Sequence, residues 1–344
     1  MKNKKRLCAF IIICSLVLFA LPGIAACAAN KDIRLTNEEQ NKTAMFNEQL
    51  PTPDADTYLE EFSDAGTYLT EFPDANFRQK VLSLLHREDS VSRTDNSIVT
   101  SYDLSLLASI PDLVLYRMGI FDLTGLEYFT GMERLDCSSN QLTALDVSKN
   151  TILEDLNCTS NQLTALDVSK NTVLRRLDCS SNQLAALDVS KNTILKWLYC
   201  SSNQLTVLDV TKNTALNELD CLFNQLTALD VSKNTVLEDL SCHTNQLTVL
   251  DVSKNTALVV LSCSNNQLTV LDVSKNTDLK SLMCSENQLT VLDVSKNTNL
   301  EWLVCNHNNM TSIDKVLGGQ LTELTRNDSF VYYPQSVPQT SVKL

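Results

Sequence analysis

A repeat of 21 residues constrains this chain more than any other feature of its sequence. Over Leu135 to Thr311 the form L-x-x-L-x-C-x-x-N-Q-L-T-x-L-D-V-S-K-N-T-x recurs nine times with few changes, the first and last copies being incomplete. Its cysteines keep an unbroken spacing of 21, at Cys137, Cys158, Cys179, Cys200, Cys221, Cys242, Cys263, Cys284 and Cys305. A unit this short cannot bury an apolar face alone, so successive units must stack into one elongated core.

Each repeat contains one short stretch with the alternation of a strand. In Leu135-Asp136-Cys137, two apolar residues flank a polar one, which is the period of a strand with one buried face. We therefore expect Arg134, Asp136 and Ser138 to point outward. Stacked in parallel about 4.8 Å apart, such strands form a sheet roughly 40 Å long. The period and the L-x-x-L-x-C-x-x-N pattern together predict a leucine-rich-repeat solenoid with a parallel β-sheet on its concave face.

An asparagine follows each predicted strand, where the coil turns inward. These residues are Asn140, Asn161, Asn182, Asn203, Asn224, Asn245, Asn266, Asn287 and Asn308. A side-chain amide has two donors and an acceptor, so we expect it to satisfy backbone groups of its own coil and the next. The rest of each coil has room only for short strand, turn or 3₁₀ structure. Because glycine and proline are absent between Gly131 and Gly318, the turns must rely on Asn, Asp and Ser.

The cysteines of the repeats allow two interpretations. Regular spacing could indicate disulfides or metal binding, but the number is odd and the chain has no C-x-x-C motif or Cys/His cluster. Each cysteine instead takes a position where an inward leucine is usual, and a free cysteine behaves as a small buried hydrophobe. We therefore predict a structural ladder of reduced, unreactive cysteines, with no metal and no cofactor.

The amino terminus has the organisation of an export signal. A basic start at residues 2–6 precedes an apolar run over residues 7–21 and small residues up to Ala26. Residues 24–27, Ile-Ala-Ala-Cys, resemble the lipobox of bacterial lipoproteins, in which the cysteine is lipidated. Ordinary cleavage of the signal and its retention as a membrane anchor are the alternatives. We predict a signal peptide over 1–26 and lipidation of Cys27, which would hold the exported protein at a membrane surface.

Charge argues against one class of partner. The chain carries 28 basic and 41 acidic residues, a formal charge of −13 at pH 7, which disfavours binding to nucleic acid. Without the four basic residues of the leader the formal charge is −17, and −10 of it lies in residues 27–131, because each Asp-Val-Ser-Lys unit of the repeats cancels its own charge. Residues 27–56 are polar and contain prolines, which indicates a flexible spacer.

The two ends of the solenoid need covers, and the sequence offers both. From residue 72 to about 113 the pattern is helical, with Phe77, Val81, Leu84 and Leu85 on one face. We therefore predict a helical N-terminal cap over 57–112, followed by leucine-rich repeats over 113–314, one divergent coil plus nine regular repeats. The apolar residues of 315–344 predict a C-terminal cap containing an added strand.

Several motifs resemble the N-terminal cap and first coil of the listerial internalins. They are Phe72-Pro73-Asp74, Val99-Thr100, Gly119-Ile120 and residues 123–128, Leu-Thr-Gly-Leu-Glu-Tyr. The 21-residue coils with a cysteine in the strand extend the resemblance to internalins of the cysteine-ladder type. In that family the cap is a shortened EF-hand, but Ser92 to Ser97 lack the first acidic ligand and the glycine of a calcium loop, so we expect no Ca²⁺ there.

The resemblance implies a bacterial surface protein with a role in adhesion or host interaction. It does not supply the ligand, because no shared motif fixes the outward residues. Covalently wall-attached internalins carry an LPxTG-type sorting signal, whereas this sequence ends at Leu344 without one, which favours the lipid anchor.

The variable outward positions are where a partner could bind. Two columns of outward residues change from charged in the early coils to apolar and aromatic in the later ones, and both tryptophans occupy the same column. Exposed aromatic residues on a rigid sheet are typical of interface hot spots. The predicted binding residues of the concave face are Trp197, Tyr199, Leu222, Phe223, His243, Val260, Met283, Trp302 and Val304. Neutral drift among duplicated repeats is the alternative explanation.

The sequence offers little for catalysis. It contains three histidines, at His86, His243 and His307, and no G-x-S-x-G, H-E-x-x-H or phosphate-loop motif. We therefore predict that the protein is not an enzyme. We expect an exported, surface-anchored protein that binds another macromolecule, most simply a protein, through its concave face. The alternative is a passive or self-associating cell-envelope component with no specific ligand.

Overall fold

The computed structural model describes residues 66–318, 330–333 and 335–336. The predicted signal peptide, the spacer and the predicted lipidation site Cys27 lie outside these residues. Within the described ranges, no helix is long and apolar enough to cross a membrane.

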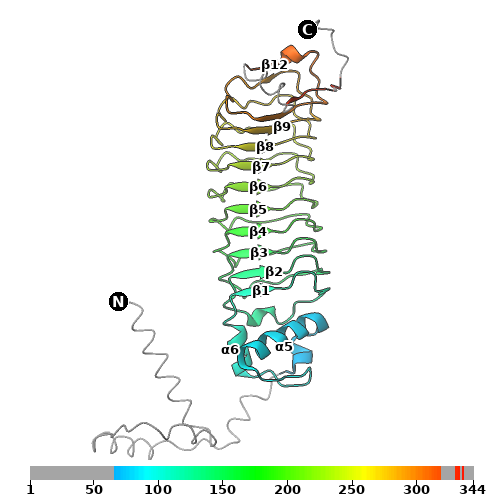
Figure 1. Ribbon diagram of the computed structural model, residues 1–344, viewed down its shortest axis with the longest axis vertical. Coiled ribbons are helices and arrows are strands. Elements are labelled where there is room, and N and C mark those ends of the chain that lie inside the picture. Colours follow the sequence, from blue (N-terminus) through cyan, green and yellow to red (C-terminus); the bar gives the residue numbers. More distant parts are fainter. Residues whose placement is uncertain (1–65, 319–329, 334, 337–344) are drawn as a thin grey trace, which may run out of the picture. The chain divides into compact units, whose positions relative to one another are not determined.

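The described residues form a stack of coils with an eleven-stranded parallel sheet along its length (Figure 1). The strands are β1 (Asp112–Val114), β2 (Arg134–Asp136), β3 (Asp155–Asn157), β4 (Arg176–Asp178), β5 (Trp197–Tyr199), β6 (Glu218–Asp220), β7 (Asp239–Ser241), β8 (Val260–Ser262), β9 (Ser281–Met283), β11 (Trp302–Val304) and β13 (Phe330–Val331). Their order in the sheet follows the sequence, and equivalent residues of successive repeats face each other. The predicted leucine-rich-repeat solenoid with its parallel sheet is confirmed.

The core of the solenoid is a set of columns, one for each constant apolar position of the repeat. In one coil Leu156, Cys158, Leu163, Val168 and Leu174 are all fully buried, and the same positions are buried in the other regular coils. All nine cysteines of the repeats are buried and free, which confirms the predicted ladder. Each coil supplies too small a core to fold alone, so its stability depends on the neighbours that cover it.

The asparagine that follows each strand links neighbouring coils. The Nδ2 of Asn161 donates to the carbonyl oxygens of Cys158 in its own coil and of Cys137 in the preceding coil, both at 3.0 Å. Its Oδ1 accepts from the amide of Leu142, also in the preceding coil, at 3.0 Å. The expectation that these amides reach the next coil is therefore wrong. The turn of each coil leaves its unpaired backbone groups facing the coil that follows, whose asparagine satisfies them.

A second asparagine column, not predicted from the sequence, crosses the back of the coils. Its members are Asn150, Asn171, Asn192, Asn213, Asn234, Asn255, Asn276 and Asn297, all fully buried. The Nδ2 of Asn171 donates to the carbonyl oxygens of Val147 and Asn150 in the preceding coil, at 3.0 and 2.9 Å. The signal for it was present in the constant Asn of every Lys-Asn-Thr.

The coils turn without glycine by placing an ordinary residue in the left-handed region. The residue before each asparagine of the first column has a positive φ of 51° to 57°. It is serine in the first four repeats, as predicted, but Phe223, Thr244, Asn265, Glu286 and His307 take this position later. A non-glycine residue in this region costs about 1 to 2 kcal/mol, and the hydrogen bonds of the adjacent asparagine hold it there.

Other elements form the back of the last coils. Strands β10 (Leu292–Asp293) and β12 (Val316–Leu317) pair in a separate two-stranded sheet, and η2 (Ile313–Lys315) lies between them in sequence. Near the start, η1 (Leu126–Tyr128) closes the first coil. These short pieces agree with the expectation that the back holds only short strand, turn or 3₁₀ structure.

Three helices precede β1 within the described residues: α4 (Tyr68–Glu71), α5 (Ala75–Asp89) and α6 (Ser101–Leu107). Helix α5 buries Phe77, Val81, Leu84 and Leu85, as its pattern predicted. Asp74 caps α5 by accepting from the amide of Phe77 at 2.9 Å, and its other oxygen accepts from the amide of Phe121 in the first coil, also at 2.9 Å. One buried carboxylate thus ties the helical segment to the solenoid.

An arginine, Arg93, joins the end of α5 to helix α6. The Arg93 guanidinium contacts Asp89 at 2.5 Å and Asp103 at 2.6 Å, and all three side chains are almost completely buried. Its hydrogen bonds lower the pKa of Asp89 to about 2. Arg93 lies within Ser92 to Ser97, the stretch that lacks the ligands of a calcium loop. Its guanidinium supplies a positive charge between the carboxylates of Asp89 and Asp103.

The last described strand continues the pattern of the repeats with different residues. Strand β13 pairs in parallel with β11, so that Val304 faces Val331. The Nε2 of Gln335 donates to the carbonyl oxygen of Cys305 at 3.1 Å, and its Oε1 accepts from the amide of Asn308 at 3.1 Å. Gln335 therefore donates to the cysteine carbonyl of the last coil as the asparagine of the following coil does elsewhere, but it accepts from a different backbone amide.

Candidate functional site

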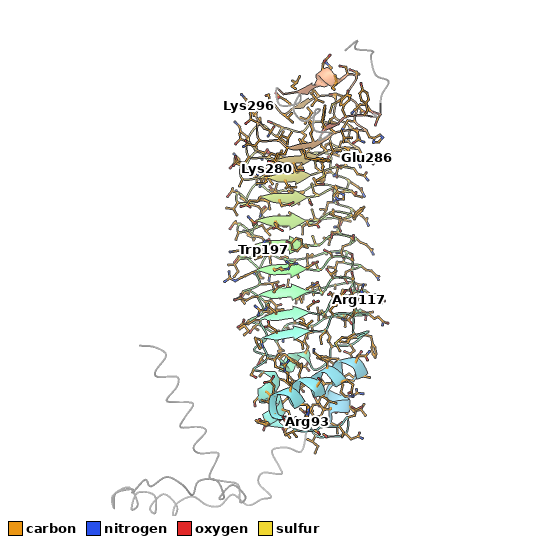
Figure 2. All side chains as sticks on the ribbon, viewed as in Figure 1. Arg93, Arg117, Trp197, Lys280, Glu286 and Lys296 are labelled. Carbon is orange, nitrogen blue, oxygen red and sulfur yellow. The ribbon has the colours of Figure 1, made fainter. Side chains whose placement is uncertain are left out.

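The candidate site is the outward face of the long sheet, here called the sheet face. It consists of the side chains at the first and third positions of β1 to β9 and β11, because the middle residue of each strand points into the core. Figure 2 shows Trp197 and Lys280 at the side where the strands begin, and Arg117 and Glu286 at the side where they end. Ser138 was also expected to face outward, but it is only 4% exposed, and its hydroxyl donates to Asp136.

The structure divides the nine predicted binding residues into three groups. Val260, Met283, Trp302 and Val304 lie close together, since Met283 and Val304 are direct partners on β9 and β11. Trp197 and Tyr199 lie on β5, separated from that group by β6 and β7. The remaining three, Leu222, Phe223 and His243, lie outside the strands, in the turns after β6 and β7.

The turn residues form a small cluster of their own. The rings of Phe223 and His243 meet edge to face with centroids 5.3 Å apart, and Phe223 is 51% exposed. Burial lowers the pKa of His243, so this imidazole is more readily neutral than a free one. This cluster borders the sheet face but does not belong to it.

The early coils carry charges that neutralise one another. Arg134 forms an ion pair with Asp112 on the preceding strand, and Arg175 pairs with Glu154 at 3.3 Å. Arg176 lies 3.7 Å from Asp155 and 3.9 Å from Asp178. Two shallow hollows of about 330 and 440 Å³ lie over these strands. Every arginine of this part of the sheet face therefore already has an acidic partner.

Strand β5 marks the change from this paired region. The Arg176 guanidinium lies over the Tyr199 ring, 4.9 Å from its centroid, in a cation–π contact. The Tyr199 hydroxyl donates to Glu218 at 2.5 Å, and burial together with this carboxylate raises the pKa of Tyr199. The ring is thus fixed between an early cation and a later anion.

The carboxylates of β6 and β7 are the functional candidates that sequence reasoning missed. Glu218, Asp220 and Asp239 form no ion pair with any described residue. Burial raises the pKa of Asp220 and of Asp239, and the charges of Glu218 and Asp220 raise that of Asp239 further. The signal was available in the sequence, because the first outward column contains no basic residue after Arg176.

The later strands complete the sheet face with apolar side chains. Trp302 is 43% exposed, and Val260, Met283 and Val304 are half-buried around it. Among the described residues, no group of three or more His, Cys, Asp or Glu side chains could hold a metal ion. The arrangement therefore offers a broad surface of graded polarity, which suits recognition of another macromolecule.

Comparison with known proteins agrees with this architecture. No family model and no curated protein sequence matches the chain. Among solved structures, the functional domain of InlJ from Listeria monocytogenes, which includes a cysteine ladder, is 36% identical with a TM-score of 0.63, covering 81% of this chain and 64% of that one. An internalin (InlF) from Listeria monocytogenes strain 4b F2365 is 20% identical with a TM-score of 0.47, covering 80% and 98%. The ectodomain of the plant receptor kinase GASSHO1/SCHENGEN3 from Arabidopsis thaliana, in complex with CASPARIAN STRIP INTEGRITY FACTOR 2, is 21% identical with a TM-score of 0.51, covering 57% and 26%.

The fold and these similarities define the chain as a leucine-rich-repeat protein. Within that class, its resemblance to the internalins, and to those with a cysteine ladder, is confirmed by the match to InlJ. The chain spans 64% of the length of the InlJ domain that it matches.

Proposed function

We propose that this protein is exported, is anchored at the cell surface, and binds another protein through its sheet face without chemical turnover. One observation carries the proposal: Trp302 stands 43% exposed among Val260, Met283 and Val304 on a rigid, in-register sheet. Aromatic side chains held in this way desolvate a large area on binding at small entropic cost. A role in adhesion or host interaction is part of this proposal.

The test is capture of a partner from cell-surface extracts of host and bacterial origin, with three forms of the full chain. The parent is compared with Trp197→Ala/Trp302→Ala and with Val249→Ala/Val270→Ala. The valines are matched controls, because they are exposed apolar residues (71% and 72%) that lie off the sheet face. We expect the parent and the valine variant to capture the same partner and the tryptophan variant to lose it.

Two outcomes would contradict this assignment. A partner held equally by all three forms would place the binding surface elsewhere. If no partner is captured and the mass of the protein rises with its concentration, the alternative of a self-associating envelope component is favoured.

Anchoring forms a separate part of the proposal. Cleavage before Cys27 and its lipidation remain predictions, as does the division of the chain into leader, spacer, caps and repeats. Replacing Cys27 by serine should release the protein from the membrane fraction into the medium. If Cys27→Ser stays with the membrane, the retained signal segment is the anchor instead.

A further inference from the structure

The charges of the sheet face differ in how they are balanced. On β2 to β4 each arginine already contacts a carboxylate, as in the pairs Arg134–Asp112 and Arg176–Asp155. A partner gains little by contacting such groups, because the new contact must replace an existing one and exposed ion pairs contribute little. These strands therefore provide weak selection for a partner's charge.

On β6 and β7 the acidic side chains have no basic side chain within ion-pair distance among the described residues. Glu218 and Asp239 are direct partners across the two strands, and Asp220 lies on the same strand as Glu218. Their hydrogen-bond donors are all uncharged: the Tyr199 hydroxyl for Glu218, the Leu222 amide for Asp220 and the Ser241 hydroxyl for Asp239. Burial raises the pKa of Asp220 and of Asp239, and neighbouring carboxylates raise both further.

The apolar group begins where the carboxylates end. Val260 on β8 is the direct partner of Asp239, Ser281 separates it from Trp302 in the same column, and Met283 and Val304 are direct partners in the neighbouring column. Four strand spacings separate β6 from β11, which is about 19 Å. An extended segment of roughly six residues covers that distance.

We infer that the sheet face from β6 to β11 binds a protein segment that carries lysine or arginine beside apolar side chains. The basic side chains would contact Glu218, Asp220 and Asp239, and the apolar ones would cover Val260, Met283 and Trp302. This inference rests on the proposed function and specifies the chemistry of its partner.

The physical basis is the cost of burying an unpaired charge. An apolar partner lying across β6 to β11 would strip water from three carboxylates without replacing it, and an acidic partner would also be repelled. A basic partner offsets that desolvation through charge-assisted hydrogen bonds. Selection thus comes as much from penalties against wrong partners as from contacts with the right one.

The test uses synthetic 12-residue peptides with identical apolar residues in one half and either three lysines or three glutamates in the other, in both orders. Affinity for the full chain is followed by tryptophan fluorescence with peptides that lack tryptophan. The parent is compared with Glu218→Gln/Asp239→Asn and with Asp251→Asn/Asp272→Asn. The second pair is a matched control, because these aspartates are exposed and lie off the sheet face.

We expect the better lysine peptide to bind the parent and the control at least tenfold more tightly than its glutamate counterpart. In Glu218→Gln/Asp239→Asn that ratio should fall close to one, while circular dichroism stays unchanged. Equal binding of both peptides, a preference for glutamate, no binding of the lysine peptides, or a ratio that survives the double substitution would each overturn the inference.

Failure of this inference can be separated from failure of the proposed function. If capture of a cell-surface partner depends on Trp197 and Trp302 but not on Glu218 and Asp239, the binding face stands and the charge selection is wrong. If capture is independent of the tryptophans, the proposed binding face itself fails.

Discussion

The early and later coils share one internal framework and present different outward surfaces. Inside, Asn161 and Asn266 make the same bonds to neighbouring carbonyl oxygens, at 3.0 Å in the early coil and 3.1 Å in the later one. Outside, the early strands carry mutually paired charges, while the later ones carry unpaired carboxylates followed by apolar residues. Since the inward residues determine the fold, the outward ones are free to differ, and the difference between the two regions is where specificity would reside.

The largest effect should be the protection of the repeat cysteines from thiol reagents, and it should be equal in the early and the later coils. Burial raises the pKa of Cys137 and of Cys263 to about 12 from a usual value of 9.0. That shift alone lowers the thiolate fraction about a thousandfold, and occlusion adds to it. Labelling with a thiol reagent at pH 8, followed by mass spectrometry, should find the repeat cysteines unreactive in native protein and reactive in denaturant.

Unequal labelling would contradict the statement that the early and later coils share one internal framework. If Cys242 or Cys263 reacted in native protein while Cys137 and Cys158 did not, the later coils would open locally, and the two regions would differ in their framework as well as in their surface.

The next largest effect should come from removing one asparagine of the first column in each region. Asn161→Ala and Asn266→Ala each leave three carbonyl oxygens and one amide without their side-chain partner. Because the two hydrogens of Nδ2 are shared among the three carbonyl oxygens, each variant loses the equivalent of about three bonds, and at about 1 kcal/mol for each the free energy of unfolding should fall by about 3 kcal/mol. Urea denaturation measures it, with Gln162→Ala as an exposed control. A difference above about 1 kcal/mol between the two variants would show that the coils are not equivalent.

The framework was predictable because each constant residue does the same work in every repeat. The leucines and cysteines were assigned from alternation and period alone, and the structure buries all of them. The direction of the asparagine bonds was not predictable, because a period does not state which way the backbone groups of a coil face. Gln335 could not be foreseen either, since it occurs once and beyond the last regular repeat.

The candidate site was predictable in part. A strict spacing of 21 gives the register, so the outward columns could be written down before the structure was known. The boundary of the strand was less certain, which is why Leu222, Phe223 and His243 were grouped with the sheet face although they lie in turns. The unpaired state of Glu218 and Asp239 required knowing which side chains approach within bonding distance.

Removing one paired charge of the early coils should have a smaller effect on stability. Arg176→Ala removes contacts to Asp155 and Asp178 and the cation–π contact with Tyr199. These groups are partly exposed, so we expect the free energy of unfolding to fall by only about 0.5 to 1 kcal/mol, and less at 1 M salt. Lys149→Ala, an exposed residue of the back, is the control and should change little. A loss above about 2 kcal/mol would mean that this pairing supports the fold itself.

The smallest effect is the dependence of the free energy of unfolding on pH, to which Asp239 and Asp251 should contribute with opposite signs. Burial and the neighbouring carboxylates raise the pKa of Asp239 above 3.8, so the folded state binds its proton more tightly than the unfolded state does. Its charge therefore destabilises the fold at pH 7, and this penalty disappears as the pH falls through the raised pKa. Asp251 is the reverse case, because the Ser253 amide lowers its pKa, and its stabilising effect is lost as the pH falls below 3.8.

Urea midpoints at pH 7, 5 and 3 for two substitutions test these signs. Asp239→Asn should raise the stability at pH 7 by a few tenths of a kcal/mol, and the gain should vanish towards pH 3. Asp251→Asn should lower the stability at pH 7, and that loss should also vanish at low pH. A loss of stability in Asp239→Asn at pH 7 would mean that this carboxylate already has a favourable partner within the protein. The later sheet face would then be as self-balanced as the early one, and it would have no unpaired charge with which to select a basic partner.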